Sequence, residues 1–512
     1  FAEGASSVDL DGRTMLPGFI EPHAHPVSIG ATILANDIVA PHEWRMPHQT
    51  YAGVSGKQGY LEAVARIMAS KGDSVNTVLI WGYHKAWHGE LTLADLDRVT
   101  GAVPTIIWQR STHEVYLNTA AARKYGVEKG VLQETEQVDW NNLHFWERAY
   151  QELKGSRLSG FFADPAMLQR GMSRMTQMMT NNGLVAMAEP SFPNASFDIE
   201  YALLKAETDS AKAYSIYLIP GFPEQFTMGM DSAAYRKRVE SFPNFNTEHI
   251  TFLPGQYKTF ADGAIYSLAL QLRDGFTGCD HCHPEWIVPP DMGEALFAEW
   301  WDAGYRLHIH ITGDLAFETY LDIVERADKR NPRPGHRTTF HHTGLFDAGL
   351  AERAARLGVE VSANPYYLWA LADRYAAVGL GPERAANMVA LGELVDRGIP
   401  ISLHSDFAMA PAEPLLLAWV AATRRVASGK VMAPEQRISV FQALQAVTIG
   451  AARSFDMEAE LGTIAVGKQA SFTLLADNPF TTEREKLKDI PVDGVVYKGR
   501  VIYNTGAEAG GR

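Results

Sequence analysis

Apolar residues recur every three or four positions in four stretches of the second half of the chain. The spacing predicts helices over residues 292–303, 314–330, 348–357 and 385–397; in the first, the apolar positions are Leu296, Phe297, Trp300 and Trp301. The last two stretches are each followed by a glycine and then by a short apolar run. Repeated strand–helix alternation of this kind predicts a parallel α/β sheet.

A different pattern closes the chain, where short β-rich runs alternate with turn residues. These runs are residues 471–475, 494–497 and 501–503, and they predict a small β-sheet. A tail folded onto the rest of the molecule is the alternative, and the regularity of the runs disfavours it.

Four strand-like runs end in histidines. His23 and His25 follow the apolar run 16–20, and because alternate residues of a strand face the same side, they can bind one metal ion together. Three later runs close with His308 and His310, with His341 and His342, and with His404 and Asp406. If the parallel sheet closes as a (β/α)8 barrel, all these strand ends meet at one mouth. An open, doubly wound sheet would instead spread them along an edge.

Several motifs together support a family resemblance. They are residues 16–26, Lys258–Gly263, His310–Asp314, the pair His341–His342, the pair Ser405–Asp406, and residues 461–470. With them the chain resembles the metal-dependent hydrolases of the amidohydrolase superfamily. Within it, the chain is similar to amidohydrolase family 3, the YtcJ-like group that includes N-substituted formamide deformylases.

The resemblance implies an α/β fold with two parts. Residues 17–455 would form a TIM-like (β/α)8 barrel with an insert around residues 40–100. Residues 1–16 and 456–512, from the two chain ends, would form a small β-sandwich domain.

The resemblance also implies a metal centre with one or two divalent ions. His23, His25 and Asp406 would bind one ion, His310 and His342 the other, and Lys258 would bridge them as a carbamate. Zinc suits such ligands best, with iron, manganese and cobalt as alternatives. Carboxylation requires a deprotonated lysine, which burial and nearby cations favour. Without the resemblance, Lys258 would be interpreted as a salt-bridge partner of Asp262 or Asp314.

This centre implies hydrolysis of an amide C–N bond, with an N-acyl or N-formyl amine as substrate. Metal-activated hydroxide would attack the carbonyl, and Asp406 would act as general base and then as general acid towards the leaving amine. Two alternatives stay open: cleavage of an ester, lactone or cyclic amide at the same site, and a non-catalytic metal-binding protein on a degenerate barrel.

Some assignments around the centre are less direct. Strand alternation lets only one of His341 and His342 face inward, and the register of the motifs favours His342. His404 would face the mouth and contact the substrate or support a ligand. We expect the remaining substrate contacts from His113, Trp87 and Tyr366, and the aromatic residues favour an apolar or aromatic acyl or amine group.

Cys279 and Cys282 are the only two cysteines and have the spacing of half a zinc knuckle. A structural zinc site usually needs a second such half, which the sequence lacks. A loop disulfide or two free thiols is therefore the favoured interpretation.

The composition of the chain limits the classes of partner that it is expected to bind. The chain has 512 residues, 46% of them hydrophobic, and a net charge of −14, which argues against nucleic acid or an anionic membrane as partner. No apolar run approaches the ~18 residues of a membrane span. We expect a small-molecule substrate and a homo-oligomer, a dimer. Relatives have further strands upstream of residue 1, so a secreted or periplasmic location stays open beside the favoured cytoplasmic one.

Overall fold

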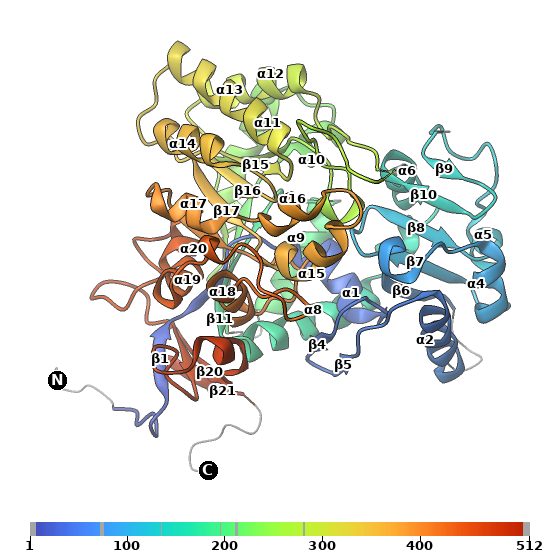
Figure 1. Cartoon of the computed structure of the whole chain (residues 1–512), viewed down its shortest axis with the longest axis horizontal. Helices are drawn as coiled ribbons and strands as arrows, with labels where there is room; N and C mark the ends of the chain where they lie inside the picture. The colour runs from blue at the N-terminus through green and yellow to red at the C-terminus, as the bar shows by residue number, and fades with distance from the viewer. Residues whose placement is uncertain are drawn as a thin grey trace.

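Two parallel sheets lie at the centre of the computed structural model, which describes residues 7–71, 76–134, 136–194, 196–209, 213–279 and 282–504 (Figure 1). One sheet has the strand order β13-β12-β11-β2, and the other has the order β14-β15-β16-β17-β18. The strands are β2 (Phe19–Glu21), β11 (Leu184–Pro190), β12 (Ser215–Ile219), β13 (Ile250–Phe252), β14 (Gln256–Phe260), β15 (Arg306–Ile311), β16 (Thr339–His342), β17 (Glu360–Ala363) and β18 (Ile401–Leu403). The predicted parallel α/β arrangement is confirmed.

The two sheets meet at both edges. Isolated parallel bridges pair Gly221 with Lys258 and Ala24 with Phe407. At the second junction the amide of Asp406 donates to the carbonyl of His23 at 3.1 Å. The carboxyl ends of β2 and β18 are therefore neighbours, although the two strands come from opposite ends of the chain.

Three of the four predicted helices are present with nearly the predicted bounds. They are α12 (Pro290–Asp302), α13 (Asp314–Arg330) and α14 (Ala348–Leu357). The apolar positions of α12 are buried, as an amphipathic helix packed on a sheet requires.

The prediction of one helix over 385–397 is wrong. The segment contains two short helices, α16 (Pro382–Ala386) and α17 (Leu391–Asp396), separated by a turn in which Val389 has φ +49°. The carbonyls of Met388 and Val389 accept hydrogen bonds from Arg424 at 3.0 and 2.7 Å. These tertiary bonds replace the intrahelical bonds that the apolar spacing had indicated.

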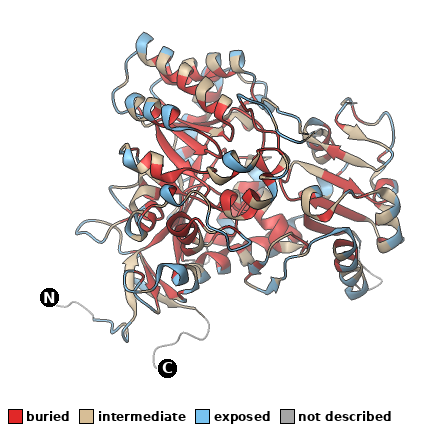
Figure 2. Ribbon diagram, viewed as in Figure 1, coloured by how far each residue is buried: buried red, intermediate tan, exposed pale blue. Residues whose placement is uncertain are grey.

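Further helices cover the parallel sheets, and the buried residues concentrate between these layers (Figure 2). They include α8 (Pro165–Asn181), α9 (Phe197–Thr208), α10 (Phe222–Thr227), α11 (Ser232–Ser241), α15 (Tyr366–Tyr375), α18 (Pro414–Thr423), α19 (Val440–Ala446) and α20 (Ile449–Arg453). Among the residues described, no helix is both long and apolar enough to cross a membrane.

A separate six-stranded sheet follows β2 and lies to one side of the molecule, blue to cyan in Figure 1. Its order is β3-β6-β7-β8-β10-β9. The bounds are β3 (Asp37–Ile38), β6 (Val78–Tyr83), β7 (Thr105–Gln109), β8 (Glu114–Leu117), β9 (Val138–Asp139) and β10 (His144–Trp146), with α2 (Lys57–Ser70), α3 (Lys85–His88), α4 (Leu93–Thr100), α5 (Thr119–Tyr125) and α6 (Glu147–Gly155) beside them. We call residues 37–146 the insert; the insert expected around residues 40–100 lies within this span.

The two chain ends form one antiparallel sheet of order β1-β19-β20-β21. Its strands are β1 (Thr14–Pro17), β19 (Phe472–Leu475), β20 (Val492–Tyr497) and β21 (Arg500–Tyr503), which matches the runs predicted at the end of the chain. The described part of these ends contains no second sheet of a sandwich. Instead, Val495 and Tyr497 pack in one cluster with Val185 and Tyr217 of the parallel strands. Residues 1–6 and 505–512 of the expected small domain, 1–16 with 456–512, lie outside the described residues.

Candidate metal centre

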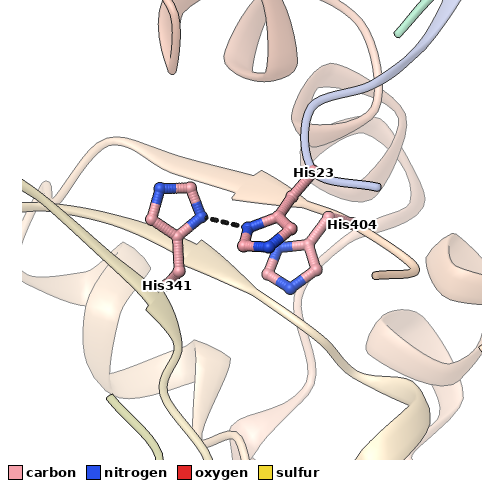
Figure 3. Close-up of side chains that lie close together, drawn as sticks. All are labelled: His23, His341 and His404. Atoms are coloured by element: carbon pink, nitrogen blue, oxygen red, sulfur yellow. Dashed lines mark hydrogen bonds between the residues drawn. The ribbon is translucent and has the colours of Figure 1, made fainter. Parts of the chain in front are cut away.

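Imidazole rings from β2, β16 and β18 meet where these strands end. Nδ1 of His23 lies 2.7 Å from Nδ1 of His341, and the ring of His23 stacks on that of His404 with centroids 4.8 Å apart (Figure 3). All three side chains are buried. The convergence follows from the junction of β2 with β18, because parallel strands end at the same edge of a sheet.

Two groups of side chains have ligand atoms close enough to share a metal ion. One is His23 with His341 and His404, and the other is His23 with His342 and Asp406; within each group these atoms lie within 4.8 Å of one another. Oδ1 of Asp406 is 3.6 Å from Nε2 of His23 and also 3.6 Å from Nε2 of His25. Oδ2 of Asp406 is 3.6 Å from Nδ1 of His342.

The other three expected ligands border this cluster. His25 contacts Asp406 as described, and the ring of His310 lies 4.3 Å from that of His342 between centroids. Lys258 on β14 is buried, and its charge contributes to the pKa shifts of His23 and His310. None of the three belongs to either close group. The structure thus brings all six expected residues to one region, with His341 and His404 in addition.

The expectation that only one of His341 and His342 faces inward is wrong. The backbone of His342 has φ +73° and that of Thr343 has φ +44°, so β16 loses its regular alternation at its last residue. His341 lies against His23 and against His308, whose Nδ1 is 2.9 Å away. His342 contacts a different ring of the cluster, because its Nδ1 is 3.1 Å from Nε2 of His404.

Several polar atoms in the cluster have no hydrogen-bond partner among the described residues. They are Nζ of Lys258, Nδ1 of His25, Nε2 of His310 and Nε2 of His342. Leaving polar atoms buried and unpaired is costly, about 1–3 kcal/mol for each group. Neutral imidazole and carboxylate donors are ligands of divalent transition metals. The donor set and its unpaired atoms therefore fit a divalent metal.

The electrostatics of the cluster favour neutral, ligand-ready imidazoles. Burial and the charge of Lys258 lower the pKa of His25 to about 3 and that of His23 well below its ordinary value. Burial also lowers the pKa of Lys258 to about 7, against the opposing charge of Asp406. Burial raises the pKa of Asp406 to about 7, although Lys258, His113 and Arg110 lower it. A lysine whose charged form is disfavoured by burial is shifted towards the deprotonated form that carboxylation requires.

Some supporting residues escaped the sequence analysis. Glu21 accepts hydrogen bonds from the amide of His23 at 3.2 Å and from the hydroxyl of Ser405 at 2.5 Å, which ties the two strand ends together. Ser362 on β17 lies 2.8 Å from Nδ1 of His404 through its hydroxyl. Glu21 stands inside the opening motif and could have been found there. Ser362 has no local signal, because only the neighbouring strand defines its role.

The expected substrate residues are spread more widely. His113 is partly exposed, and its Nδ1 lies 3.0 Å from Oε2 of Glu147. Burial opposes protonation, but Glu147 raises the pKa of His113 above its ordinary value. Trp87 packs beside His84, while Tyr366 is buried. His404 belongs to the histidine cluster rather than to a pocket wall.

A cavity of about 630 Å³ lies between the insert and residues 266–269 and 374–378, and no residue of the histidine cluster lines it. Its lining includes His84, Tyr116, Glu147, Tyr266 and Tyr375. Tyr266 lies 5.6 Å from the ring of Tyr367, whose hydroxyl is 3.4 Å from Nδ1 of His342. The cavity is thus separated from the histidines by two side chains.

The cysteine pair forms a disulfide, one of the two favoured interpretations. Cys279 and Cys282 are bonded, with Cα atoms 5.6 Å apart. The sulfur atoms are therefore not thiolate ligands of a second metal site.

The sequence matches the model of a known protein family along most of its length. A model described as the amidohydrolase family matches residues 7–503. The chain belongs to the amidohydrolase family. Membership supports a hydrolase in general terms.

Individual relatives are distant but nearly full-length. A Bacillus subtilis protein named as the amidohydrolase YtcJ is 23% identical, over 97% of this chain and 90% of that protein. An N-substituted formamide deformylase of Arthrobacter pascens is 22% identical, over 98% and 90%. The solved structure of a metal-dependent hydrolase of Pyrococcus horikoshii aligns with a TM-score of 0.69 at 17% identity, over 94% and 89% of the two chains. That likeness supports the fold alone.

Proposed function

We propose that this protein hydrolyses the amide C–N bond of an N-acyl or N-formyl amine, in a centre that holds one or two divalent metal ions. The observation that supports this most is the buried cluster of His23, His341, His342, His404 and Asp406 at the ends of three parallel strands. We also propose that the two parallel sheets, joined at both edges, form one (β/α)8 barrel, which keeps its chemistry at this end.

The ligands we propose are His23, His25 and Asp406 for one ion and His310 and His342 for the other. Lys258, as a carbamate, would lie between them, and the unpaired Nζ and the lowered pKa of this lysine support its carboxylation. His341 is hydrogen-bonded within the cluster and would orient His23. When bound, the ions would polarise the substrate carbonyl and lower the pKa of water towards ~7.

Asp406 would move the proton. Its carboxylate faces His23 and His25 at 3.6 Å, and burial raises its pKa above the ordinary range, which favours a group that accepts and returns a proton. It would take up the proton of the attacking water and deliver it to the leaving amine. His113, held by Glu147 and with a raised pKa, would donate a hydrogen bond to the substrate.

The name of the Arthrobacter relative favours N-formyl amines among the amides. The aromatic side chains that line the neighbouring cavity, such as Tyr116, Tyr266 and Tyr375, favour substrates with an apolar or aromatic group.

A substrate panel tests the proposal. The purified protein would be loaded separately with Zn²⁺, Mn²⁺ or Co²⁺ and incubated with N-formyl, N-acetyl and N-benzoyl amines, each beside the ester of the same acyl group. We expect release of the amine from at least one amide. Cleavage of esters alone would show that the C–N assignment is wrong, and a metal-loaded protein inert to every compound would contradict hydrolysis itself.

A further inference from the structure

Arg110, directly after β7 of the insert, is a buried cation for which the described residues provide no ion pair. Its relative exposure is 3%. Removing a charge from water costs several kcal/mol when no counter-charge compensates it. The groups around this guanidinium must therefore supply the compensation.

Aromatic rings and backbone carbonyls surround it. The guanidinium carbon lies 4.8 Å from the ring centroid of Trp44 and 4.6 Å from those of Trp81 and Tyr266, within the range of cation–π attraction. Its two terminal nitrogens donate hydrogen bonds to the carbonyls of Ala408 at 2.8 Å and Met409 at 2.5 Å.

These two carbonyls belong to the turn that begins at Asp406. The amide of Met409 donates to the carbonyl of Asp406 at 2.5 Å, and Asp406 has φ +53°, a region that residues other than glycine seldom adopt. Such a conformation persists only where the surroundings hold it. The hydroxyl of Tyr266 donates to the Met409 carbonyl as well, at 2.8 Å.

We propose that Arg110 is a positioning residue, which holds the Asp406–Met409 turn so that the Asp406 carboxylate faces His23 and His25. The inference rests on the proposed role of Asp406 as proton carrier. The insert then has a role in the metal centre. Arg110, which follows a strand of the insert, positions Asp406 at the ends of the parallel strands.

The contacts require a guanidinium. It offers two donors in one plane and faces that stack on aromatic rings, whereas an ammonium group is a compact charge without a planar face. Arg110→Lys should therefore hold the turn only in part, and Arg110→Met should release it.

Arg424 offers a matched control. It is 1% exposed and donates hydrogen bonds to the carbonyls of Ala386, Met388, Val389 and Met432, none of which belongs to the Asp406–Met409 turn. Arg424→Met thus removes a buried guanidinium and several carbonyl bonds without touching the turn.

The experiment measures kcat and KM with an amide that the wild type cleaves. Bound metal and melting temperature are measured for the same variants. Because a misplacement of ~1 Å at a reacting group costs about 100-fold in rate, we expect kcat of Arg110→Met to fall about 100-fold while KM and bound metal stay near the wild-type values. Arg110→Lys should lie between the two, and Arg424→Met should keep the wild-type kcat despite a lower melting temperature. If Arg110→Met does not fold, Tyr266→Phe, which removes one donor to Met409, should still lower kcat.

Wild-type kcat in Arg110→Met, or in Tyr266→Phe when that variant replaces it, would overturn the proposal, and so would an equal loss in Arg424→Met. If the wild type cleaves no amide, the proposed function fails, and a crystal structure of an Arg110 variant then decides the inference. A displaced Asp406 carboxylate would support positioning by Arg110, and an unmoved one would overturn it.

Discussion

At the scale of single residues, the centre combines groups whose ordinary protonation states are disturbed by burial. Burial raises the pKa of Asp406 and lowers that of Lys258 because it disfavours their charged forms, while their mutual attraction opposes that effect. Perturbed groups of this kind gather at functional sites. Two predictions belong to these residues.

Replacing Asp406 by Asn should remove most turnover and leave most of the metal bound. The amide keeps the shape and one oxygen donor but cannot accept the proton, and loss of general acid–base catalysis costs about 10²–10⁴-fold. Turnover and metal content per chain would be measured together. Asp302→Asn, which alters exposed contacts with Arg330 and Asn331, is the control and should behave as the wild type. Full turnover in Asp406→Asn would show that another group moves the proton.

Replacing Lys258 by Ala should weaken metal retention, because it removes the proposed bridge. We expect a loss of affinity of at least ~10-fold, the lower end of what mutation of supporting metal contacts costs, measured by competition with a chelator. Formate or acetate should restore part of the activity by taking the place of the carbamate oxygens. Lys154→Ala, a partly buried lysine over the ring of Phe162, provides the comparison. Unchanged affinity and rate in Lys258→Ala would mean that no bridge exists.

At the scale of elements, the carboxylate of Asp262, just after β14, is hydrogen-bonded to the turn between β15 and α13. Asp262 accepts hydrogen bonds from the amides of Thr312 and Gly313 at 2.8 Å and from that of Gln271 at 2.9 Å. A Cβ atom on Gly313 would lie 2.0 Å from the carbonyl oxygen of Gln271, so the turn admits only glycine there. Asp262 thereby helps to place His310, two residues before Thr312.

Asp262→Ala should lower the free energy of unfolding by about 3 kcal/mol or more, because several buried amides lose their acceptor at a cost of ~1–3 kcal/mol each. The midpoint of urea unfolding would measure this. Asp231→Ala removes a single exposed helix cap, an acceptor for the amide of Ala234 at 2.7 Å, and should cost only about 1 kcal/mol. Equal effects of the two substitutions would show that Asp262 is not a fastening point.

Element prediction succeeded where local spacing and tertiary packing agree. Helices α13 and α14 have the predicted bounds because the apolar positions that predicted them are buried in the folded chain. The segment 385–397 failed because Arg424, outside the segment, bonds the carbonyls of its central turn. In the same way, both His341 and His342 enter the cluster because β16 ends in an unusual backbone conformation, which no periodicity encodes.

At the scale of the whole molecule, bound metal should couple to stability. A ligand that binds only the folded chain stabilises it by about 4 kcal/mol at 1,000 times its dissociation constant, and the cluster gathers ligands from distant strands. Removing metal with a chelator should lower the melting temperature, and adding back Zn²⁺ should restore it. A melting temperature indifferent to chelator and metal would contradict a metal centre in the folded protein.

The sequence alone determined the parallel α/β class, three helices, the strands at the chain's end and the residue types at the strand ends, because these depend on periodicity and on motifs within short segments. Tertiary structure decided what depends on distant segments meeting: the junction of β2 with β18, the inclusion of His341 and His404 in the cluster, and the contact of Arg110 with the Asp406 turn. Hydrogen bonds between residues hundreds of positions apart leave no pattern in the neighbourhood of either partner. Only the packing of the two parallel sheets against each other brings such partners within bonding distance.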